Sequence, residues 1–481
     1  MVTYPIDQGS VHLFQTRGRR FAFDVHSCVF LEVDEPMWDV LHFGSVVRNR
    51  RELVQALSPR YGPQAAGSLA DELDQLSAHR VLFLPDMLEE HVLPDPQDVA
   101  TLCVNLTQAC NLRCRYCFAG GGSYGQPATM MTPDTARRTV DFLLQHAGQH
   151  DNLSLSFFGG EPLLNFGTMQ QTVEYASQQA ERFGKTFRFN LTTNGTLLSR
   201  TVRRFLREQR FGVIVSIDGP PEVHDAMRPY AKGGGSYDTI RRYLEAFQKE
   251  RRPDEAAWTL RATFSRQHLH FADQVLHLAG LGFEDISVEP CTSTDPDLAI
   301  GWADLPALKA EYDEFAGHYL ESIRTGQKFS FFHFRVMIEQ ARRGTQRLAQ
   351  CGAGRGYLAV SAAGELYPCH RLVGVEPYQI GTVHEGITHP ERRALFAAAH
   401  VNSKELCRRC WARYICGGGC HACAIEFNGD IFEPYELECE LVKHRIELGA
   451  CLYAELSGAE LDQLSVLYDR ASANRPHLSS A

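Results

Sequence analysis

Residues Ala109-Cys-Asn-Leu-Arg-Cys-Arg-Tyr-Cys-Phe118 contain three cysteines, Cys110, Cys114 and Cys117, spaced C-x3-C-x2-C with an aromatic residue before the last one. A [4Fe-4S] cluster normally takes four thiolates. Three close thiolates therefore leave one iron open to a small molecule that chelates through nitrogen and oxygen. Zinc prefers four ligands, usually as two C-x2-4-C pairs, and no second pair lies near this run. The spacing favours an iron–sulfur site over a zinc knuckle or a buried thiol cluster.

The composition indicates a globular protein of two or three domains. The chain has 481 residues, 44% of them hydrophobic, and a net charge of -10. Such a charge argues against a nucleic-acid partner, which would need a basic face. No apolar run approaches the length of a membrane span, and the polar N-terminus is not a signal peptide, so we expect a soluble, cytoplasmic protein. Fifteen cysteines in a reducing compartment indicate metal binding or catalysis.

Residues 99–330 alternate apolar strands with amphipathic helices. Such alternation predicts a parallel sheet with right-handed crossovers and helices on its outer face. The helices are expected at 133–146, 169–183, 201–209, 237–248 and 270–281. The strands are expected at 101–106, 153–158, 187–192, 212–217, 258–264 and 286–289.

Three polar motifs follow the second, third and fourth of these strands. They are Phe158-Gly-Gly-Glu-Pro162, Thr193-Asn-Gly-Thr196 and Ser216-Ile-Asp-Gly-Pro220. Glycines allow close backbone approach, and the acidic residue of the first motif can hold a cation. Because the carboxyl ends of parallel strands meet at one edge of a sheet, we expect the chemistry to lie there.

Residues 1–98 contain no candidate cluster ligand. Three short strands at 11–16, 20–25 and 27–33 precede three helical segments at 36–41, 52–57 and 65–76. This order predicts a small winged-helix-like domain. This domain has two possible roles. As a helper domain it would cover the α/β part that follows in the chain. As a recognition domain, which we favour, it would bind a peptide, an extended segment of which pairs with an exposed strand edge.

A second block of cysteines lies in a glycine-rich region with little periodicity, between 351 and about 455. A region with so little regular structure needs cross-links to stabilise its fold, and metal clusters can provide them. Cys28, Cys103, Cys291 and Cys451 are scattered elsewhere and are expected to be small buried residues. The block contains Cys351, Cys369, Cys407, Cys410, Cys416, Cys420, Cys423 and Cys439.

The three-cysteine run followed by Gly-Gly-Glu-Pro resembles the radical S-adenosylmethionine (SAM) enzymes, which have an open, partial (β/α)6 barrel. The resemblance implies that Cys110, Cys114 and Cys117 ligate the cluster whose open iron binds SAM. It assigns SAM or substrate contacts to Gly159, Gly160, Glu161, Pro162, Thr193, Asn194, Ser216 and Asp218, with Arg228 and Arg261 as candidates for the SAM carboxylate. Asp218, Glu289 and His370 are candidate catalytic bases.

The cysteine block resembles the SPASM domain, which holds two auxiliary iron–sulfur clusters. By this resemblance Cys407, Cys410, Cys416 and Cys439 ligate the distal cluster, and Cys351, Cys369 and Cys420 ligate the proximal cluster. The proximal cluster then has three thiolates and an iron open to a substrate thiolate. The alternative is that Cys423 fills that position; we favour the open iron.

The whole chain resembles SPASM-type peptide maturases that form thioether cross-links, such as maturases of six-cysteine (SCIFF-type) peptides and of quinohaemoprotein amine dehydrogenase. The resemblance implies three [4Fe-4S] clusters, SAM, an external one-electron donor of the flavodoxin or ferredoxin type, and a small Cys-containing substrate with a leader segment. The product would join Cys sulfur to a backbone or side-chain carbon, such as an Asp or Glu methylene. Carbon–carbon cross-linking and formylglycine formation by a sulfatase maturase are the alternatives.

These expectations divide the chain into five parts. Residues 1–98 form the recognition domain and 99–330 the barrel. Residues 331–350 connect it to the SPASM domain at 351–468, and 469–481 form a polar tail.

Overall fold

The N-terminal part is an antiparallel sheet followed by three helices, as the sequence predicts. The computed structural model describes residues 2–4, 6, 7, 9–94, 98–252, 255, 258–326 and 329–472. Asp34 and Asn49 each accept a hydrogen bond from the backbone at the start of α1 and α2, which ends the preceding extended segments. The elements are β1 (Val11–Thr16), β2 (Arg19–Asp24), β3 (Val29–Glu32), α1 (Glu35–Gly44), α2 (Arg50–Tyr61) and α3 (Pro63–Ala78).

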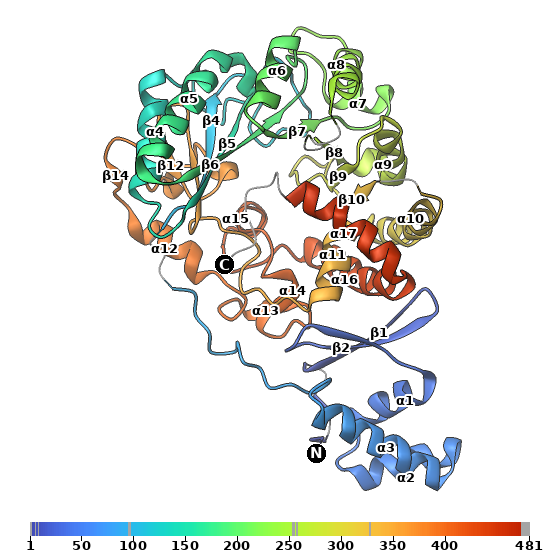
Figure 1. Cartoon of the computed structure of the whole chain (residues 1–481). Coiled ribbons are helices and arrows are strands. Elements are labelled where there is room, and N and C mark those ends of the chain that lie inside the picture. The colour runs from blue at the N-terminus through green and yellow to red at the C-terminus, as the bar shows by residue number, and fades with distance from the viewer. Residues whose placement is uncertain are drawn as a thin grey trace.

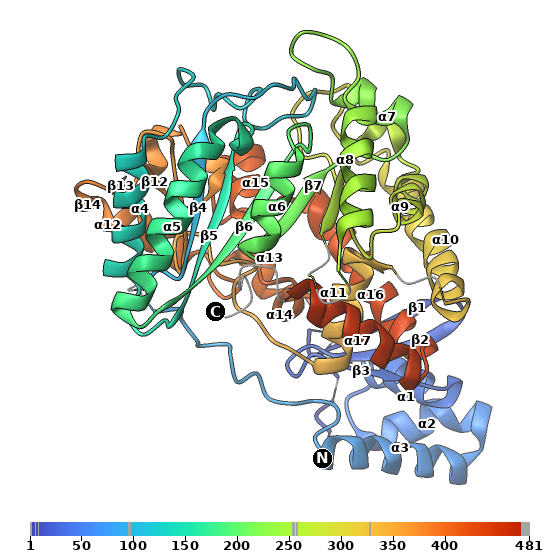
Figure 2. The same ribbon diagram turned by 45° about the horizontal axis from the view of Figure 1, so that its top comes forward.

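The centre of the molecule is a strongly curved sheet, which confirms the expected α/β fold. Its strands run in the order β10-β9-β8-β7-β6-β5-β4-β11-β12-β13-β14, and every pair from β10 to β11 is parallel. Figures 1 and 2 show the sheet curved, with helices on its convex side; its concave side is the interior of the barrel. The six predicted strands are β4 (Thr101–Thr107), β5 (Asn152–Gly159), β6 (Thr186–Thr193), β7 (Gly212–Ser216), β8 (Thr259–Phe264) and β9 (Asp285–Pro290).

Helices cover the outer face of this sheet, where the main hydrophobic core lies. Thr132 caps α4 and Pro133 occupies its first turn, as predicted. Strand side chains on the concave face of the sheet are more polar than those on the convex face, because they do not pack against the helix layer. The helices of this part are α4 (Pro133–Gln145), η1 (Pro162–Asn165), α5 (Phe166–Phe183), α6 (Arg200–Glu208), α7 (Pro221–Met227), α8 (Tyr237–Glu250), η2 (Arg266–His268), α9 (Phe271–Gly280) and α10 (Leu305–Arg324).

The C-terminal part is more regular than its sequence indicated. The expected connecting segment contains a helix, α11, and the sheet continues past it, because β11 pairs in parallel with β4. A 20-residue helix, α16, ends the cysteine-rich region. Its elements are β10 (Ser330–Phe331), α11 (Phe332–Arg343), β11 (Tyr357–Val360), β12 (Glu365–Tyr367), η3 (His370–Leu372), η4 (Glu376–Tyr378), β13 (Gly381–Thr382), β14 (Gly386–Ile387), α12 (Pro390–Ala398), α13 (Glu405–Arg408), α14 (Arg413–Cys416), α15 (His421–Asn428), α16 (Glu436–Glu455) and α17 (Gly458–Ser472).

The expected tail begins inside a helix, because residues 469–472 belong to α17, whereas 473–481 lie outside the described residues. Residues 95–97 of the expected linker also lie outside them. No helix in the described ranges has the length and apolar character needed to cross a membrane.

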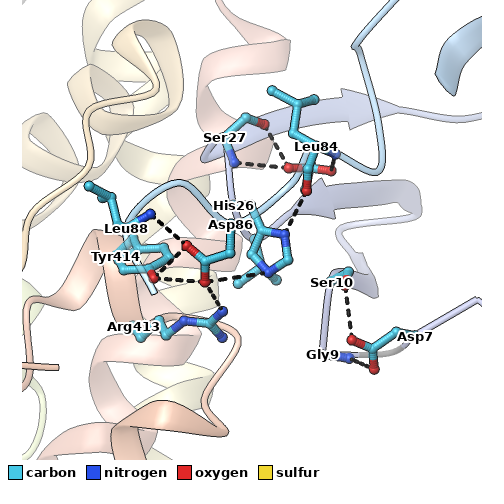
Figure 3. A network of polar contacts seen from close by, with 12 residues as sticks. Asp7, Gly9, Ser10, His26, Ser27, Leu84, Asp86, Leu88, Arg413 and Tyr414 are labelled. Carbon is cyan, nitrogen blue, oxygen red and sulfur yellow. Dashed lines mark hydrogen bonds and ion pairs between the residues drawn. The ribbon is translucent and has the colours of Figure 1, made fainter. Parts of the chain in front are cut away.

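The N-terminal sheet packs against the cysteine-rich part rather than against the barrel. Phe14, Phe21 and Phe23 share a buried cluster with residues of α14 and α16, and Figure 1 shows β1 and β2 beside these helices. Figure 3 shows the polar side of this contact: Asp86 accepts hydrogen bonds from Arg413 (2.9 Å) and Tyr414 (2.8 Å). The two parts are therefore joined by both apolar and charged contacts.

Candidate functional site

The three-cysteine run lies on the loop after β4, at the carboxyl end of the sheet. The Gly160 amide donates to the Thr107 carbonyl, and the Glu161 amide donates to the Ala109 carbonyl, so the Gly-Gly-Glu-Pro turn is bonded to the start of the run. A Cβ atom at Gly159 or Gly160 would overlap these same carbonyl groups. Glycine is therefore required here for the two loops to meet.

The thiols of Cys110, Cys114 and Cys117 are close enough to affect one another electrostatically. Burial raises the pKa of the Cys114 thiol to about 12; the guanidinium of Arg228 opposes this, and the two other thiols add to it. Three such thiolates need a nearby cation, which an iron cluster would supply. In such a cluster each thiolate would bind a different iron.

Glu161 ties the Gly-Gly-Glu-Pro motif to the Thr193-Asn-Gly-Thr196 motif. Its buried carboxylate accepts hydrogen bonds from the Thr193 hydroxyl (2.7 Å), the Asn194 amide (2.8 Å) and the Leu163 amide (3.0 Å). Burial raises the pKa of Glu161 to about 7, against the effect of these donors. The Asn194 side chain in turn approaches the Cys110 sulfur at 3.7 Å. Glu161 thus anchors the loops around the thiols, and its carboxylate is occupied by the protein's own donors.

Asp218 and Arg228 form a buried ion pair beside Cys114. Arg228 Nε lies 3.0 Å from an Asp218 carboxylate oxygen, and Arg228 Nη1 lies 3.9 Å from the Cys114 sulfur. Asp218 also accepts hydrogen bonds from the Tyr116 hydroxyl and from the Thr263 amide, the latter at 3.0 Å. Both side chains are thus engaged within the protein, which favours a positioning role over proton transfer or carboxylate binding. Tyr116 is a site residue whose role the sequence did not indicate.

Arg261 and Glu289 face the open interior from adjacent strands. Arg261 on β8 is exposed while Leu260 and Ala262 beside it are fully buried, so its side chain points away from the helix layer. Glu289, at the end of β9, accepts hydrogen bonds from the Ser287 hydroxyl (2.6 Å) and from His333 Nε2 (2.8 Å). Burial opposes ionisation of Glu289, but His333 and Arg261 outweigh it, and the pKa of this carboxyl lies well below its usual range.

Of the two arginines assigned to the SAM carboxylate, Arg261 is thus the more open. Ser216 ends β7 directly beside it in the sheet register.

His370 lies between the barrel and the cysteine-rich part. Its ring packs edge-on against Phe118 and Phe158, with centroids 5.9 and 5.2 Å away. Its Nδ1 lies 2.8 Å from the Tyr357 hydroxyl. Burial lowers the pKa of His370 to about 3, with help from nearby arginines, so the imidazole is neutral near pH 7. Among the three candidate bases, His370 and Glu289 are the ones near the open interior.

The remaining candidate ligands fall into two groups, as the SPASM resemblance implies. Mutual repulsion among Cys407, Cys410, Cys416 and Cys439 adds to burial in raising their pKa values, most clearly for the Cys439 thiol. These four thiols line one cavity of about 260 Å³. Cys351, Cys369 and Cys420 form the second group. Burial is the largest cause that raises the pKa values of the Cys351 and Cys369 thiols, and Cys420 adds to both. The pKa of Cys420 itself is lowered to about 5, chiefly by its hydrogen bond with Cys423.

Lys404 lies between the two groups of thiols. It is fully buried, donates to the Gly418 carbonyl at 2.8 Å, and interacts electrostatically with thiols of both groups. A buried cation suits the summed negative charge of two thiolate-ligated clusters. No sequence pattern marked this residue, because a lysine near cysteines is ordinarily a surface residue.

Residues 104–261, which contain the thiols of the first group, match the Radical SAM superfamily. This part of the chain is a radical SAM domain. A [4Fe-4S] cluster and SAM are its implied cofactors, and the buried thiols and glycine-lined turn fit them. The C-terminal thiol groups are consistent with a SPASM domain.

Two curated relatives span most of the chain. An uncharacterized protein of Archaeoglobus fulgidus is 25% identical over 72% of this chain and 80% of its own length. The cysteine-type anaerobic sulfatase-maturating enzyme of Clostridium perfringens strain 13 is 24% identical over 66% of this chain and 87% of its own length.

Two solved structures share the fold of this chain. Native anSMEcpe with bound AdoMet has a TM-score of 0.62 at 21% identity and covers 78% of this chain and 100% of its own. Streptococcus suis SuiB bound to S-adenosylmethionine has a TM-score of 0.51 at 14% identity and covers 89% and 98%. At these identities the likeness concerns the fold alone.

Proposed function

We propose that this radical SAM enzyme matures a small Cys-containing peptide or protein by forming intrapeptide thioether cross-links. The observation that carries the proposal is the second group of C-terminal thiols, Cys351, Cys369 and Cys420. This group has three members, whereas the distal group has four, and it is linked to the barrel mouth through His370. Three thiolates are one fewer than a [4Fe-4S] cluster normally takes, so a substrate thiolate can complete the set.

The residues of the barrel bind and orient the reactants. When bound and reduced, the cluster and SAM supply a 5'-deoxyadenosyl radical that removes hydrogen from a substrate carbon. Cys110, Cys114 and Cys117 hold the cluster, and the backbone of Gly159 and Gly160 allows SAM to approach closely. Thr193 and Asn194 are held in place by Glu161, and Ser216 and Asp218 flank the same space.

The charged residues of the interior hold the substrate. Arg261 pairs with a carboxylate, either that of SAM or that of an acidic substrate residue, and Glu289 offers its ionised carboxylate to a hydrogen-bond donor. An acidic substrate residue is better accommodated in this charged interior than in an apolar one, which favours a thioether to an Asp or Glu methylene. His370 and Glu289 are the candidate bases nearest this space, but the lowered pKa of each makes it a weak acceptor of the proton that the substrate thiol gives up.

The N-terminal sheet is a suitable binding site for a leader segment. In the described part of the chain, β3 pairs only with β2, so its other edge offers backbone groups to an added strand. Leader binding would raise the effective concentration of the modified segment at the barrel. A peptide substrate is also favoured by the structural neighbour anSMEcpe, which has been solved with bound AdoMet and Kp18Cys peptide. An external flavodoxin- or ferredoxin-type donor would supply the electron that reduces the SAM-binding cluster, and an auxiliary cluster would accept the electron left over when the sulfur–carbon bond forms.

The test is the intact mass of a small Cys-containing protein encoded beside this gene, co-expressed anaerobically with the enzyme. We expect a loss of two hydrogens per bond, fewer thiols that can be alkylated, and a sulfur–carbon link in the fragment spectra. The Cys114→Ala variant, which lacks one ligand of the SAM-binding cluster, should leave the mass unchanged. An oxidised mass with every thiol still alkylatable would instead indicate carbon–carbon coupling.

Formylglycine formation is the second candidate, because the sulfatase-maturating relative is similar over two thirds of this chain. That reaction would leave an aldehyde on one Cys or Ser, which reacts with hydrazides, whereas a thioether does not. About a third of this chain lies outside the alignment, which favours a different substrate.

A further inference from the structure

Cys423 has a guanidinium group and a second thiol as direct neighbours. It is 2% exposed and lies in the first turn of α15, three residues after Cys420. The Arg371 guanidinium donates to its sulfur at 3.0 Å, and the Cys420 thiol contacts it directly. By contrast, the Cys28 thiol lies in an apolar cluster and donates to the Val25 carbonyl. A thiol in such a polar site is poorly explained as packing and suits ligation.

Cys423 is close to the proximal thiol group. Arg371 Nη1 also lies 4.0 Å from the Cys420 sulfur, so one guanidinium serves both thiols. Arg371 belongs to η3, which begins directly after Cys369, and this ties the Cys423 pocket to a second member of the group. A small movement of the Cys423 side chain would therefore make it a fourth thiolate beside Cys351, Cys369 and Cys420.

The same pocket can also hold Cys423 when it is not a ligand. Arg371 keeps its place through an ion pair with Glu426, and the Glu438 carboxyl forms a hydrogen bond with the Cys423 thiol. A thiol released from iron would thus remain hydrogen-bonded in a buried site, which removes the usual cost of leaving such a group without partners. Both positions of Cys423 are consequently stabilised.

The pocket lies toward the mouth of the barrel. The Arg371 guanidinium stacks over the Phe118 ring, 5.8 Å from its centroid, and its charge reaches Cys291, which follows β9. Phe118 directly follows the three-cysteine run. A substrate thiol that enters the barrel mouth would therefore meet the Cys423 side of the proximal group.

We propose that Cys423 is an exchangeable fourth ligand of the proximal cluster, bound when substrate is absent and replaced by the substrate cysteine. The inference rests on the proposed function. In the exchange, the iron–sulfur bond to Cys423 breaks and one to the substrate sulfur forms, and the proton of the substrate thiol passes to Cys423. No electron moves. With Cys423 bound, the resting cluster has four thiolates, and its iron is protected from cellular thiols. When Cys423 leaves, the same iron is open to the substrate during catalysis.

The experiment uses the full chain with Cys110, Cys114 and Cys117 changed to Ala, so that only auxiliary clusters remain. Iron content and the electron paramagnetic resonance spectrum of the reduced protein are recorded during titration with 2-mercaptoethanol. The same is done with the added change Cys423→Ala, with Cys423→Ser, and with Cys451→Ala as a buried-thiol control. Thermal melts verify that each variant is folded.

We expect equal iron in all four proteins. The spectra of the two Cys423 variants should shift at a concentration of 2-mercaptoethanol at least about tenfold lower than in the parent, because a tethered thiol competes at a millimolar effective concentration. The Cys451 control should match the parent. Identical titrations of parent and Cys423 variants would overturn the proposal, as would loss of half the iron on Cys423→Ala, since an exchangeable ligand is dispensable for holding the cluster. A parent without auxiliary iron would instead contradict the proposed function.

Discussion

Oε2 of Glu289 lies 2.8 Å from Nε2 of His333, and Nδ1 of the same imidazole lies 2.9 Å from the Tyr312 hydroxyl. Glu289 reaches the interior of the barrel, whereas His333 and Tyr312 are buried behind it on α11 and α10. Burial lowers the pKa of His333, so a neutral ring donates to an ionised carboxylate. The ring thereby fixes one orientation of a charged group that faces the substrate.

Loss of the hydrogen bond from His333 to Glu289 should lower product formation but leave SAM cleavage largely unchanged. In His333→Phe, Glu289 loses its fixed orientation, and we expect cross-linked product to fall about 10- to 100-fold, as for other residues that orient a reacting group. SAM cleavage in the absence of peptide should change little. Tyr319→Phe is a suitable control, because Tyr319 is another fully buried tyrosine near α11 whose hydroxyl has no side-chain partner in the described ranges. Equal product per cleaved SAM in both variants would contradict the positioning role.

The Asp218–Arg228 pair should control binding of SAM rather than proton transfer. Asp218→Asn leaves the Arg228 charge buried beside Cys114 without its partner, which costs about 3–5 kcal/mol of stability for a buried pair. We expect weaker SAM binding in the iron-loaded protein, measured as loss of the SAM-induced change in its resonance spectrum. Glu250→Gln is the matched control: it breaks the Arg203–Glu250 pair (2.7 Å) on α6 and α8, away from the thiols. It should lower stability but leave the SAM response intact.

Docking of the N-terminal domain should weaken in acid through Asp86. Burial opposes ionisation of this carboxyl, but hydrogen bonds from Tyr414 and Arg413 outweigh it and lower its pKa. A depressed pKa stabilises the contact above the unfolded value of about 4, and that stabilisation is lost as pH falls through the folded value. Hydrogen exchange of β1 and β2 should therefore speed up below about pH 4.

The Asp86→Asn variant tests the same contact at neutral pH. It should lower the free energy of opening of β1 and β2 by about 2 kcal/mol, the contribution of hydrogen bonds to a charged group. Hydrogen exchange of these strands should therefore be faster, and its acid dependence should be lost. Asp7→Asn is the control, since the Asp7 carboxylate accepts hydrogen bonds from Gly9 and Ser10 of its own turn. Acid sensitivity that persists in Asp86→Asn would assign it to another group.

The barrel could be predicted from sequence because each strand is a short apolar run followed by a polar motif. The same reasoning missed α16, since its cysteine, glutamate and arginine positions have no clean helical stripe when the residues face thiols and other helices on several sides. It missed the pairing of β11 with β4 because these strands are far apart along the chain and only β4 has an apolar run of useful length.

The functional site was likewise predicted only in part. Cysteine spacing marked Cys110, Cys114 and Cys117 as one set of ligands, and the SPASM resemblance implied which C-terminal thiols belong together. It gave no signal for His333, Tyr312 or Lys404, which act through partners distant in sequence. Glu161 was expected to hold a cation, and the fold instead uses its carboxylate to join two loops.

That use of Glu161 leads to a sharp prediction for Glu161→Gln. Both carboxylate oxygens accept hydrogen bonds, one from Leu163 and Thr193 and the other from Asn194. An amide must turn its NH2 group toward a backbone N–H in either orientation, so one buried donor is left without an acceptor, at a cost of about 1–3 kcal/mol.

We expect this variant to have a lower melting temperature and weaker SAM affinity, because the displaced Asn194 no longer supports Cys110. Glu174→Gln, on the exposed face of α5, should change neither. If SAM affinity fell in Glu161→Gln without any loss of stability, the carboxylate would act on the ligand directly rather than through the loops.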